Sequence, residues 1–205
     1  MKRRTLLAAG GGAMIAGTIP RLAFAQEAEG REVVEMVRGS AEASVEVIEY
    51  ASYTCPHCAS FHANQLPALQ ANYIDTGLVR FVYREVYFDR PGLWASMIAR
   101  CPGDQDFFFA FTSLLYEQQR AWLGSGDPAI IVEELRRMAK TVGLDDASLD
   151  ACLSDAAKAE TLFNWYQANA ERDGITGTPS FMINGQKYAN MAYDDFAAIL
   201  DEKLG

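Results

Sequence analysis

Two cysteines that are two residues apart, directly after an apolar stretch, constrain the fold of this 205-residue chain more than any other feature. The stretch Val45–Tyr50 has the composition of a β-strand, and Cys55-Pro56-His57-Cys58 follows where a helix would begin. Thiols at this spacing can form or open a disulfide with little movement of the chain. Because a helix N-terminus favours the reactive thiolate, the motif predicts disulfide exchange with Cys55 as the nucleophile and Cys58 one turn inward.

The first 25 residues have the pattern of a secretory signal peptide and are set apart from the fold. The basic start Lys2-Arg3-Arg4 precedes an apolar stretch, Leu6–Ile19, and Ala23-Phe24-Ala25 resembles a signal-peptidase site. The apolar stretch is shorter than the ~20 residues that span a bilayer, which disfavours a membrane anchor. Arg3-Arg4 also fits twin-arginine export, so the Sec and Tat routes both stay open. Export predicts a periplasmic protein.

The net charge disfavours nucleic acids and membrane surfaces as partners. The formal net charge is -9, and removal of residues 1–25, which hold four basic and no acidic residues, takes it to -13. An acidic surface repels phosphate backbones and anionic lipids. Residues 26–205 are enough for one hydrophobic core, and we expect a monomer.

The pattern along the chain predicts strands at both ends and helices in between. Strands are expected at 32–37, 45–50 and 78–84, and the helix that begins at Cys55 should kink at Pro67. Further helices are expected at 93–100, 105–119, 129–142 and 154–172, then a hairpin with an Asn184-Gly185 turn and a closing helix at 193–204. This order predicts an α/β sheet that a helical segment interrupts.

The cysteine motif and Gly177-Thr178-Pro179-Ser180-Phe181 together resemble the DsbA family of bacterial thiol-disulfide oxidoreductases, over nearly all of residues 26–205. The resemblance implies a thioredoxin-like fold with an inserted helical domain, the former at 26–90 and 174–205 and the latter at 91–173. It also implies that Pro179 is cis, lies against the active-site disulfide and binds substrate together with Thr178. From the residues alone, an ordinary trans proline before a strand fits equally.

The same resemblance implies the partners and the cofactors. Reduced or unfolded exported proteins would be the substrates, and a membrane redox partner would regenerate the disulfide. The Cys55–Cys58 disulfide would be the redox group, with no further cofactor and no metal.

Thr178 departs from the best-known oxidases of the family, which carry Val before this proline, whereas several isomerases carry Thr. Those isomerases usually have an N-terminal dimerisation domain, and the roughly twenty residues between position 25 and the first part of the fold are too few for one. We therefore expect an oxidase that introduces disulfides into exported proteins. A disulfide isomerase or reductase is the alternative.

Two further side chains are expected to assist the cysteines. A protonated or donating His57 imidazole would stabilise the Cys55 thiolate beyond the ~2 kcal/mol that a helix terminus supplies. Glu49 lies six residues before Cys55, and the resemblance implies that a buried acid at this place passes protons to the inner cysteine. In the alternative, Glu49 faces solvent or pairs with Arg80 or Arg84.

Cys101 and Cys152 are expected to form a structural disulfide across the helical segment, as in some relatives. Two free buried thiols are the alternative. The aromatic segment Phe107–Phe111 is expected to be core packing between the two lobes.

Metal binding is the competing interpretation of the cysteine motif. Cys55 and Cys58 could form half of a zinc or copper site, and His62 follows at a plausible spacing. Structural zinc sites usually need a second close pair of ligands, which the sequence does not offer. A metal-binding thioredoxin-like module is therefore the rival from another class, and His62 is expected on the helix surface.

Overall fold

A computed structural model describes residues 32–205, so the predicted signal peptide lies outside the described residues. Within this range, no helix is both long and apolar enough to cross a bilayer. The first half contains β1 (Met36–Arg38), β2 (Val45–Ala51), α1 (Pro56–Asn64), α2 (Leu66–Leu69), the π-helical turn η1 (Gln70–Ile74), β3 (Val79–Glu85) and α3 (Arg90–Ala99). The second half contains α4 (Gln105–Glu117), α5 (Gln119–Leu123), α6 (Pro128–Thr141), α7 (Asp146–Ser154), α8 (Ala156–Arg172), β4 (Ser180–Ile183), β5 (Gln186–Ala189) and α9 (Tyr193–Leu204).

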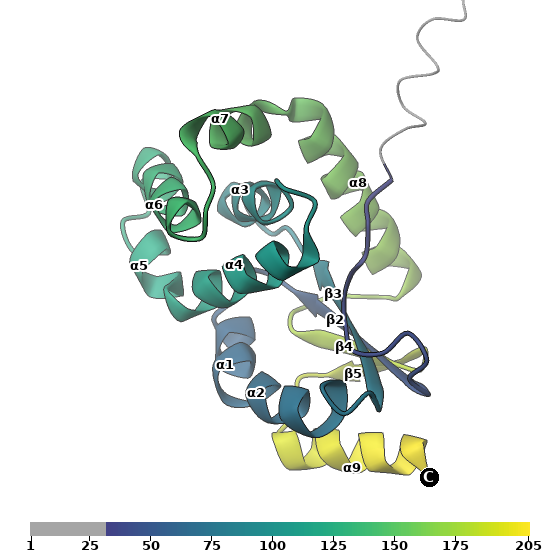
Figure 1. Ribbon diagram of the computed structural model, residues 1–205. Helices are drawn as coiled ribbons and strands as arrows, with labels where there is room; N and C mark the ends of the chain where they lie inside the picture. Colours follow the sequence, from purple (N-terminus) through teal and green to yellow (C-terminus); the bar gives the residue numbers. More distant parts are fainter. Residues whose placement is uncertain (1–31) are drawn as a thin grey trace, which may run out of the picture. The chain divides into compact units, whose positions relative to one another are not determined.

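The strands form one mixed sheet in the order β1-β3-β2-β4-β5 (Figure 1). β2 and β3 are parallel, and the other neighbouring pairs are antiparallel. β2 therefore lies in the middle of the sheet, where Glu49 stands beside Tyr83 on one side and Phe181 on the other. This arrangement places the loop that carries Cys55 at the C-terminal end of a central, buried strand, as is usual for sites in open α/β sheets.

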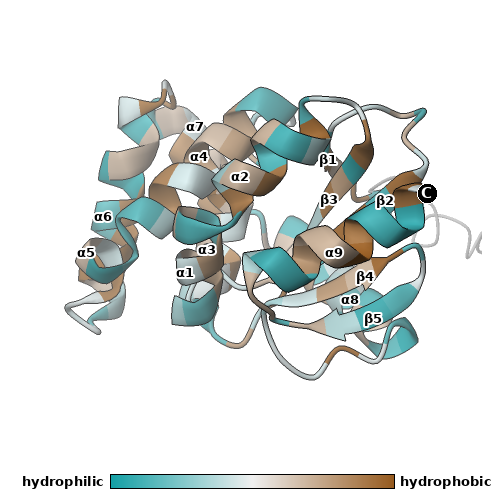
Figure 2. Ribbon diagram, turned by 90° about the horizontal axis from the view of Figure 1, so that it is seen from below, coloured by the Kyte–Doolittle hydropathy of each residue, from teal (hydrophilic) through white to brown (hydrophobic). Residues whose placement is uncertain are grey.

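Helices cover both faces of this sheet. On one face, the rings of Phe61 in α1, Phe181 in β4 and Phe196 in α9 are in mutual contact. On the other face, Tyr50 and Met182 pack with Tyr166 of α8. Figure 2 shows α9 beside β4, with hydrophobic and hydrophilic residues alternating along the helix as expected for one that buries a single face.

The segment between β3 and β4 is helical and packs around its own aromatic residues. Phe108, Phe109 and Phe111 of α4 are buried, which agrees with the core packing expected of this aromatic segment. The Cys101 and Cys152 sulfurs form a disulfide with Cα atoms 5.7 Å apart, which joins the end of α3 to α7. A bridge across 51 positions stabilises the fold by about 2–4 kcal/mol. The predicted α/β fold with a helical insertion is thus confirmed.

Proline, asparagine and glycine shape the backbone at two places where the sequence predicted a break or a turn. α1 ends at Asn64 and α2 begins at Leu66, because Pro67 has no N–H to continue the helical bonding. The Asn184-Gly185 turn has the positive φ angles, 46° and 79°, that the predicted hairpin requires.

One expected strand is shorter in the structure, and two short helices, α5 and α7, were not among the expected elements. The first strand covers only Met36–Arg38 rather than 32–37, because the Val34 carbonyl accepts a hydrogen bond from the Arg100 guanidinium instead of pairing in the sheet. Helix α7 was missing from the expected elements. Its signal is the N-cap Asp145, whose carboxylate accepts from the Ser148 amide, but the helix is too short for a clear periodic pattern.

Candidate active site

Cys55 occupies the position just before the first turn of α1. Its backbone is extended, with φ -82° and ψ 121°, and Pro56 takes the first helical position. Both cysteines are free thiols, Cys55 being partly exposed and Cys58 completely buried. Because the first amides of a helix have no intrahelical acceptors, this end of α1 offers donors and a positive dipole to the Cys55 sulfur.

These surroundings lower the pKa of Cys55 from 9.0 to about 5. The largest cause is a hydrogen bond from the Cys58 thiol, and partial burial of the sulfur opposes it. The Thr178 hydroxyl and the backbone amides of Cys58 and His57 contribute further donors to the thiolate. Cys55 is therefore a thiolate at neutral pH.

Burial has the opposite effect on Cys58. Desolvation raises the pKa of its thiol far above the usual range, and the hydrogen bond to Cys55 and the charge of Glu49 raise it further. The pair thus consists of an ionised outer sulfur and a protonated inner one. With this difference in acidity, a substrate thiol exchanges with Cys55, whose thiolate is also a good leaving group, and Cys58 can displace a substrate that is bound to Cys55 as a mixed disulfide.

The loop before β4 lies directly against the outer sulfur. The Thr178–Pro179 peptide bond is cis, and the Cys55 thiol donates to the Thr178 carbonyl oxygen at 3.3 Å. Thr178 Oγ1 is buried and, among residues 32–205, has no hydrogen-bond partner in this thiol form. When Cys55 ionises, its sulfur stops donating, and this hydroxyl becomes a donor for the thiolate.

Replacing Thr178 by valine removes that donor while keeping the shape of the side chain. We expect the pKa of Cys55 to rise by about 1 unit, because a hydrogen bond to a charged group contributes about 1.5–3 kcal/mol and one unit is 1.36 kcal/mol. The pH dependence of the thiolate's ultraviolet absorbance in the reduced protein measures this shift. Thr178→Ser, which keeps the hydroxyl, is the matched control and should titrate like the unmodified protein; equal titration of the valine variant would contradict the hydroxyl's role.

Gln119 is a site residue that the sequence did not indicate. Its buried amide, at the start of α5, donates from Nε2 to the carbonyl oxygens of Tyr53 at 2.8 Å and Cys55 at 2.9 Å. The helical insertion thereby holds the backbone on which Cys55 sits. No local pattern could reveal these contacts, because more than 60 positions separate Gln119 from each of its two partners.

Glu49 and His62 lie behind the inner cysteine. Glu49 is completely buried, and both of its carboxylate oxygens lie within 3.1 Å of His62 Nε2. The expectation that His62 is a surface residue is wrong, since its side chain is only 8 % exposed. Glu49 therefore pairs with His62. Arg80 pairs instead with Glu46, and Arg84 pairs with Glu35 and Asp173.

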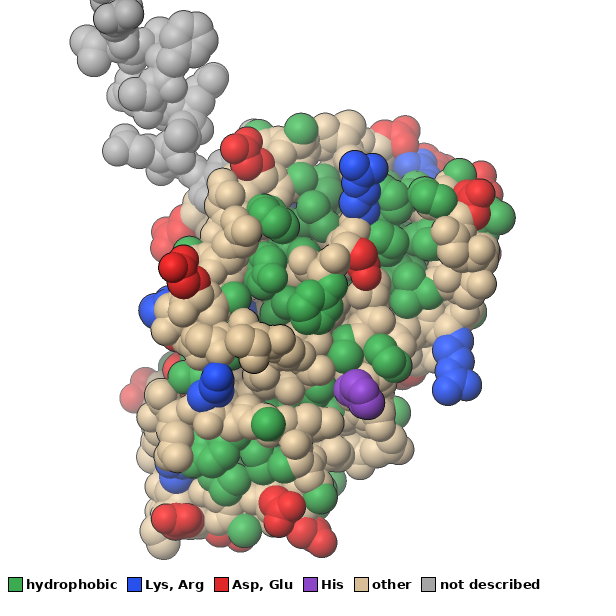
Figure 3. All heavy atoms as spheres, turned by 180° about the vertical axis from the view of Figure 1, so that it is seen from behind, with side chains coloured by type: hydrophobic (Ala, Val, Ile, Leu, Met, Phe, Trp, Pro, Cys, Tyr) green, Lys and Arg blue, Asp and Glu red, His purple; other side chains and the backbone are tan. Residues whose placement is uncertain are grey.

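The His57 side chain is exposed on the first turn of α1. The backbone amide of His57 donates to the Cys55 thiolate and lowers the pKa of Cys55, whereas a contribution from the imidazole stays a prediction. Figure 3 shows an exposed histidine between groups of hydrophobic side chains on the face opposite to that of Figure 1. Within residues 32–205, no group of three or more His, Cys, Asp or Glu side chains is arranged to hold a metal ion.

Comparison with known proteins agrees with this geometry. A family model described as Thioredoxin matches residues 31–202. A Rickettsia typhi protein provisionally named protein-disulfide oxidoreductase is 33% identical over 170 residues, which are 83% of this chain and 62% of that protein. Disulfide bond formation protein D of Bacillus subtilis is 24% identical over 176 residues, covering 82% of this chain and 76% of that one.

Solved structures show the same fold. The crystal structure of α-DsbA1 from Wolbachia pipientis superposes with a TM-score of 0.77 at 26% identity, covering 87% of this chain and 94% of that one. That of oxidised BdbD from Bacillus subtilis has a TM-score of 0.73 at 23% identity, covering 83% of this chain and 92% of the other.

Proposed function

The chain belongs to the thioredoxin family, among its DsbA-like members, and we propose that it is an exported thiol-disulfide oxidoreductase that introduces disulfide bonds into other exported proteins. One observation carries this proposal. Cys55 is a partly exposed sulfur whose pKa is lowered to about 5, and the buried Cys58 thiol beside it has a raised pKa. Stabilising the thiolate stabilises the reduced pair, which makes the disulfide a strong oxidant.

The reaction begins with the oxidised Cys55–Cys58 pair. A substrate thiolate attacks Cys55 Sγ, a mixed disulfide forms, and Cys58 leaves. The second substrate thiol then attacks the substrate sulfur of the mixed disulfide and releases Cys55, which leaves easily because its thiolate is stable. Two electrons have passed from the substrate to the pair, and a membrane oxidant would take them up to restore the disulfide.

Substrate binding is assigned to the loop at Thr178 and Pro179. The Thr178 carbonyl lies within 3.3 Å of the reactive sulfur, so an extended substrate segment could pair with backbone beside Cys55. An apolar side chain, Phe88, is 57% exposed and precedes Asp89, whose carboxylate accepts from the Thr54 hydroxyl next to Cys55. These features fit unfolded substrates, which present both backbone and apolar residues.

Export to the periplasm is part of the proposal and rests on the signal pattern of residues 1–25. The chain spans 62% of the length of the Rickettsia typhi relative.

Equilibration with glutathione redox buffers tests the proposed direction of exchange. We expect a reduction potential near the roughly -120 mV of DsbA, and a value near the roughly -270 mV of thioredoxin would contradict an oxidase and favour a reductase. Refolding of scrambled ribonuclease, which requires disulfides to be rearranged, distinguishes an isomerase from an oxidase and from a reductase. Metal content after purification tests the metal-binding alternative.

A further inference from the structure

A buried carboxylate, Glu49, is paired with an imidazole, His62, that lines a cavity between α1 and α4. Glu49 has no exposed surface, and its charge acts on the Cys58 thiol. His62 lies one turn beyond Cys58 on the same helix, with its Nε2 3.0 Å and 3.1 Å from the two Glu49 oxygens. The Tyr116 ring packs against the imidazole with a centroid separation of 4.2 Å, which fixes its orientation.

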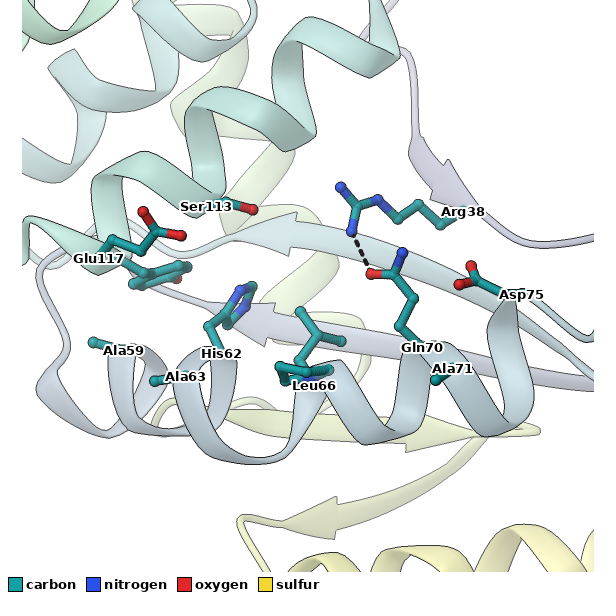
Figure 4. A pocket seen from close by; sticks show the side chains of 12 residues that line it. Arg38, Ala59, His62, Ala63, Leu66, Gln70, Ala71, Asp75, Ser113 and Glu117 are labelled. Atoms are coloured by element: carbon teal, nitrogen blue, oxygen red, sulfur yellow. Dashed lines mark hydrogen bonds between the residues drawn. The ribbon is translucent and has the colours of Figure 1, made fainter.

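The cavity has a volume of about 560 Å³ and lies between the α1–η1 segment and α4. Figure 4 shows His62 rising from α1 into the space below Ser113 and Glu117 of α4, with Arg38 and Gln70 bounding the space farther along. A cavity of this size that is partly lined by charged and polar side chains has room and hydrogen-bond partners for water. His62 therefore contacts Glu49 through Nε2 and lines a water-accessible space.

We propose, on the premise that Cys55 and Cys58 exchange disulfides as above, that His62 is the proton-relay residue that connects Glu49 and Cys58 with water in this cavity. His62 acts through Glu49 and does not touch the substrate. The relay is needed because Cys58 is fully buried and has to change its protonation state in each catalytic cycle.

The proton balance follows the sulfur chemistry. When substrate attacks Cys55, the Cys55–Cys58 bond breaks and its electron pair stays on Cys58. A proton from cavity water passes to His62 and from there to Glu49, which delivers it to that sulfur and is left ionised. During reoxidation the path runs backwards, so that Cys58 loses its proton, attacks Cys55 in the mixed disulfide with the oxidant, and expels the oxidant's thiolate.

The other ionisable groups around the pair do not replace His62. Burial raises the pKa values of Tyr83 and Tyr116 well above the usual range, so both phenols stay neutral. Arg38 is bound to Gln70, and Glu117 and Asp75 line the cavity from α4 and from the end of η1. Imidazole is the side chain that exchanges protons most readily near neutral pH.

The test separates attack at Cys55 from resolution by Cys58. Reduced protein is mixed with excess glutathione disulfide, quenched with acid at intervals and weighed by mass spectrometry, which distinguishes the mixed disulfide from the closed Cys55–Cys58 pair. In His62→Gln, whose amide keeps the contact to Glu49 but carries no exchangeable acidic proton, we expect unchanged formation of the mixed disulfide. Its resolution should be slower by about ten- to a hundredfold near neutral pH, and the difference should shrink as rising pH lets hydroxide in the cavity take over from His62 as the acceptor of the proton that Glu49 receives from Cys58.

Chemical rescue distinguishes a relay from a merely structural role. Imidazole added to His62→Ala should accelerate resolution, but should not do so when Glu49→Gln is also present. Gln70→Ala, which alters the same cavity without touching Glu49, is the matched control and should resolve normally. If His62→Ala does not fold, as judged by thermal unfolding, His62→Gln carries the test.

An unchanged rate and pH profile in His62→Gln would overturn the relay, and so would a slowing that is equal at every pH. Failure of the unmodified protein to form any mixed disulfide at Cys55 would instead contradict the proposed exchange function, so the two failures are distinct.

Discussion

Cys55→Ser is expected to abolish thiol-disulfide exchange with protein substrates. At pH 7, a thiol with a pKa of about 5 is ~99% ionised, whereas one with a pKa of 9.0 is ~1% ionised. The remaining Cys58 is buried and has a raised pKa, so it supplies practically no thiolate and is closed to a protein substrate. Oxidation of a reduced model substrate by stoichiometric protein, followed by thiol counting, measures the loss.

Cys58→Ser is the matched variant, because it keeps the nucleophile and removes the group that resolves adducts. It should accumulate mixed disulfides between Cys55 and substrates, visible as adducts that a reductant removes. Adducts in Cys55→Ser, or substrate oxidation at the unmodified rate, would show that Cys55 is not the reacting sulfur.

Arg100→Leu is expected to destabilise the fold by about 3–5 kcal/mol, because it leaves a buried carboxylate without its counter-charge. Arg100 donates from Nε and Nη2 to the two Glu85 oxygens at 2.6 Å and 2.7 Å, and Ser96 donates to the same carboxylate. Both charged side chains are nearly inaccessible, with exposed fractions of 4% and 1%. The pair joins the end of β3 to the end of α3, where the sheet meets the helical insertion.

Urea unfolding of the oxidised protein measures this loss. Arg80→Leu is the matched control, since Arg80 pairs with Glu46 at the surface and its removal should cost about 0–1 kcal/mol. Replacing Glu85 and Arg100 together by apolar residues should recover much of the stability. Equal losses for Arg80→Leu and Arg100→Leu would contradict the importance of burial at this pair.

The parts of the site that depend on neighbouring residues were predictable from the sequence. The spacing of Cys55 and Cys58 after an apolar strand predicted that both cysteines lie at the start of a helix, and Cys55 indeed precedes the first turn of α1 while Cys58 lies on it. The Asn184-Gly185 pair predicted the hairpin because few residues other than Asn and Gly adopt positive φ without strain.

The contacts that depend on tertiary structure were not predictable. β2 is largely buried, so apolar and polar residues do not alternate clearly along it. The sequence therefore does not show whether the Glu49 side chain faces the core or solvent. His62 is a polar residue on a short helix whose sequence shows no clear apolar face, and the packing of α4 over α1 buries it. Gln119 reaches the cysteine loop from a helix that begins 64 positions later.

The acidity of Cys55 is the central physical claim, and its titration tests that claim most directly. The rate at which iodoacetamide alkylates the reduced, folded protein reports the thiolate fraction of Cys55, because Cys58 is buried. The fold lowers the pKa of Cys55 to about 5, so above that pH the ionised thiolate stabilises the reduced, folded protein. This stabilisation is lost as the pH falls through about 5 and the thiolate becomes protonated. The account predicts an alkylation profile with a midpoint near pH 5, and a midpoint near the ~8.5 of an ordinary cysteine would contradict it.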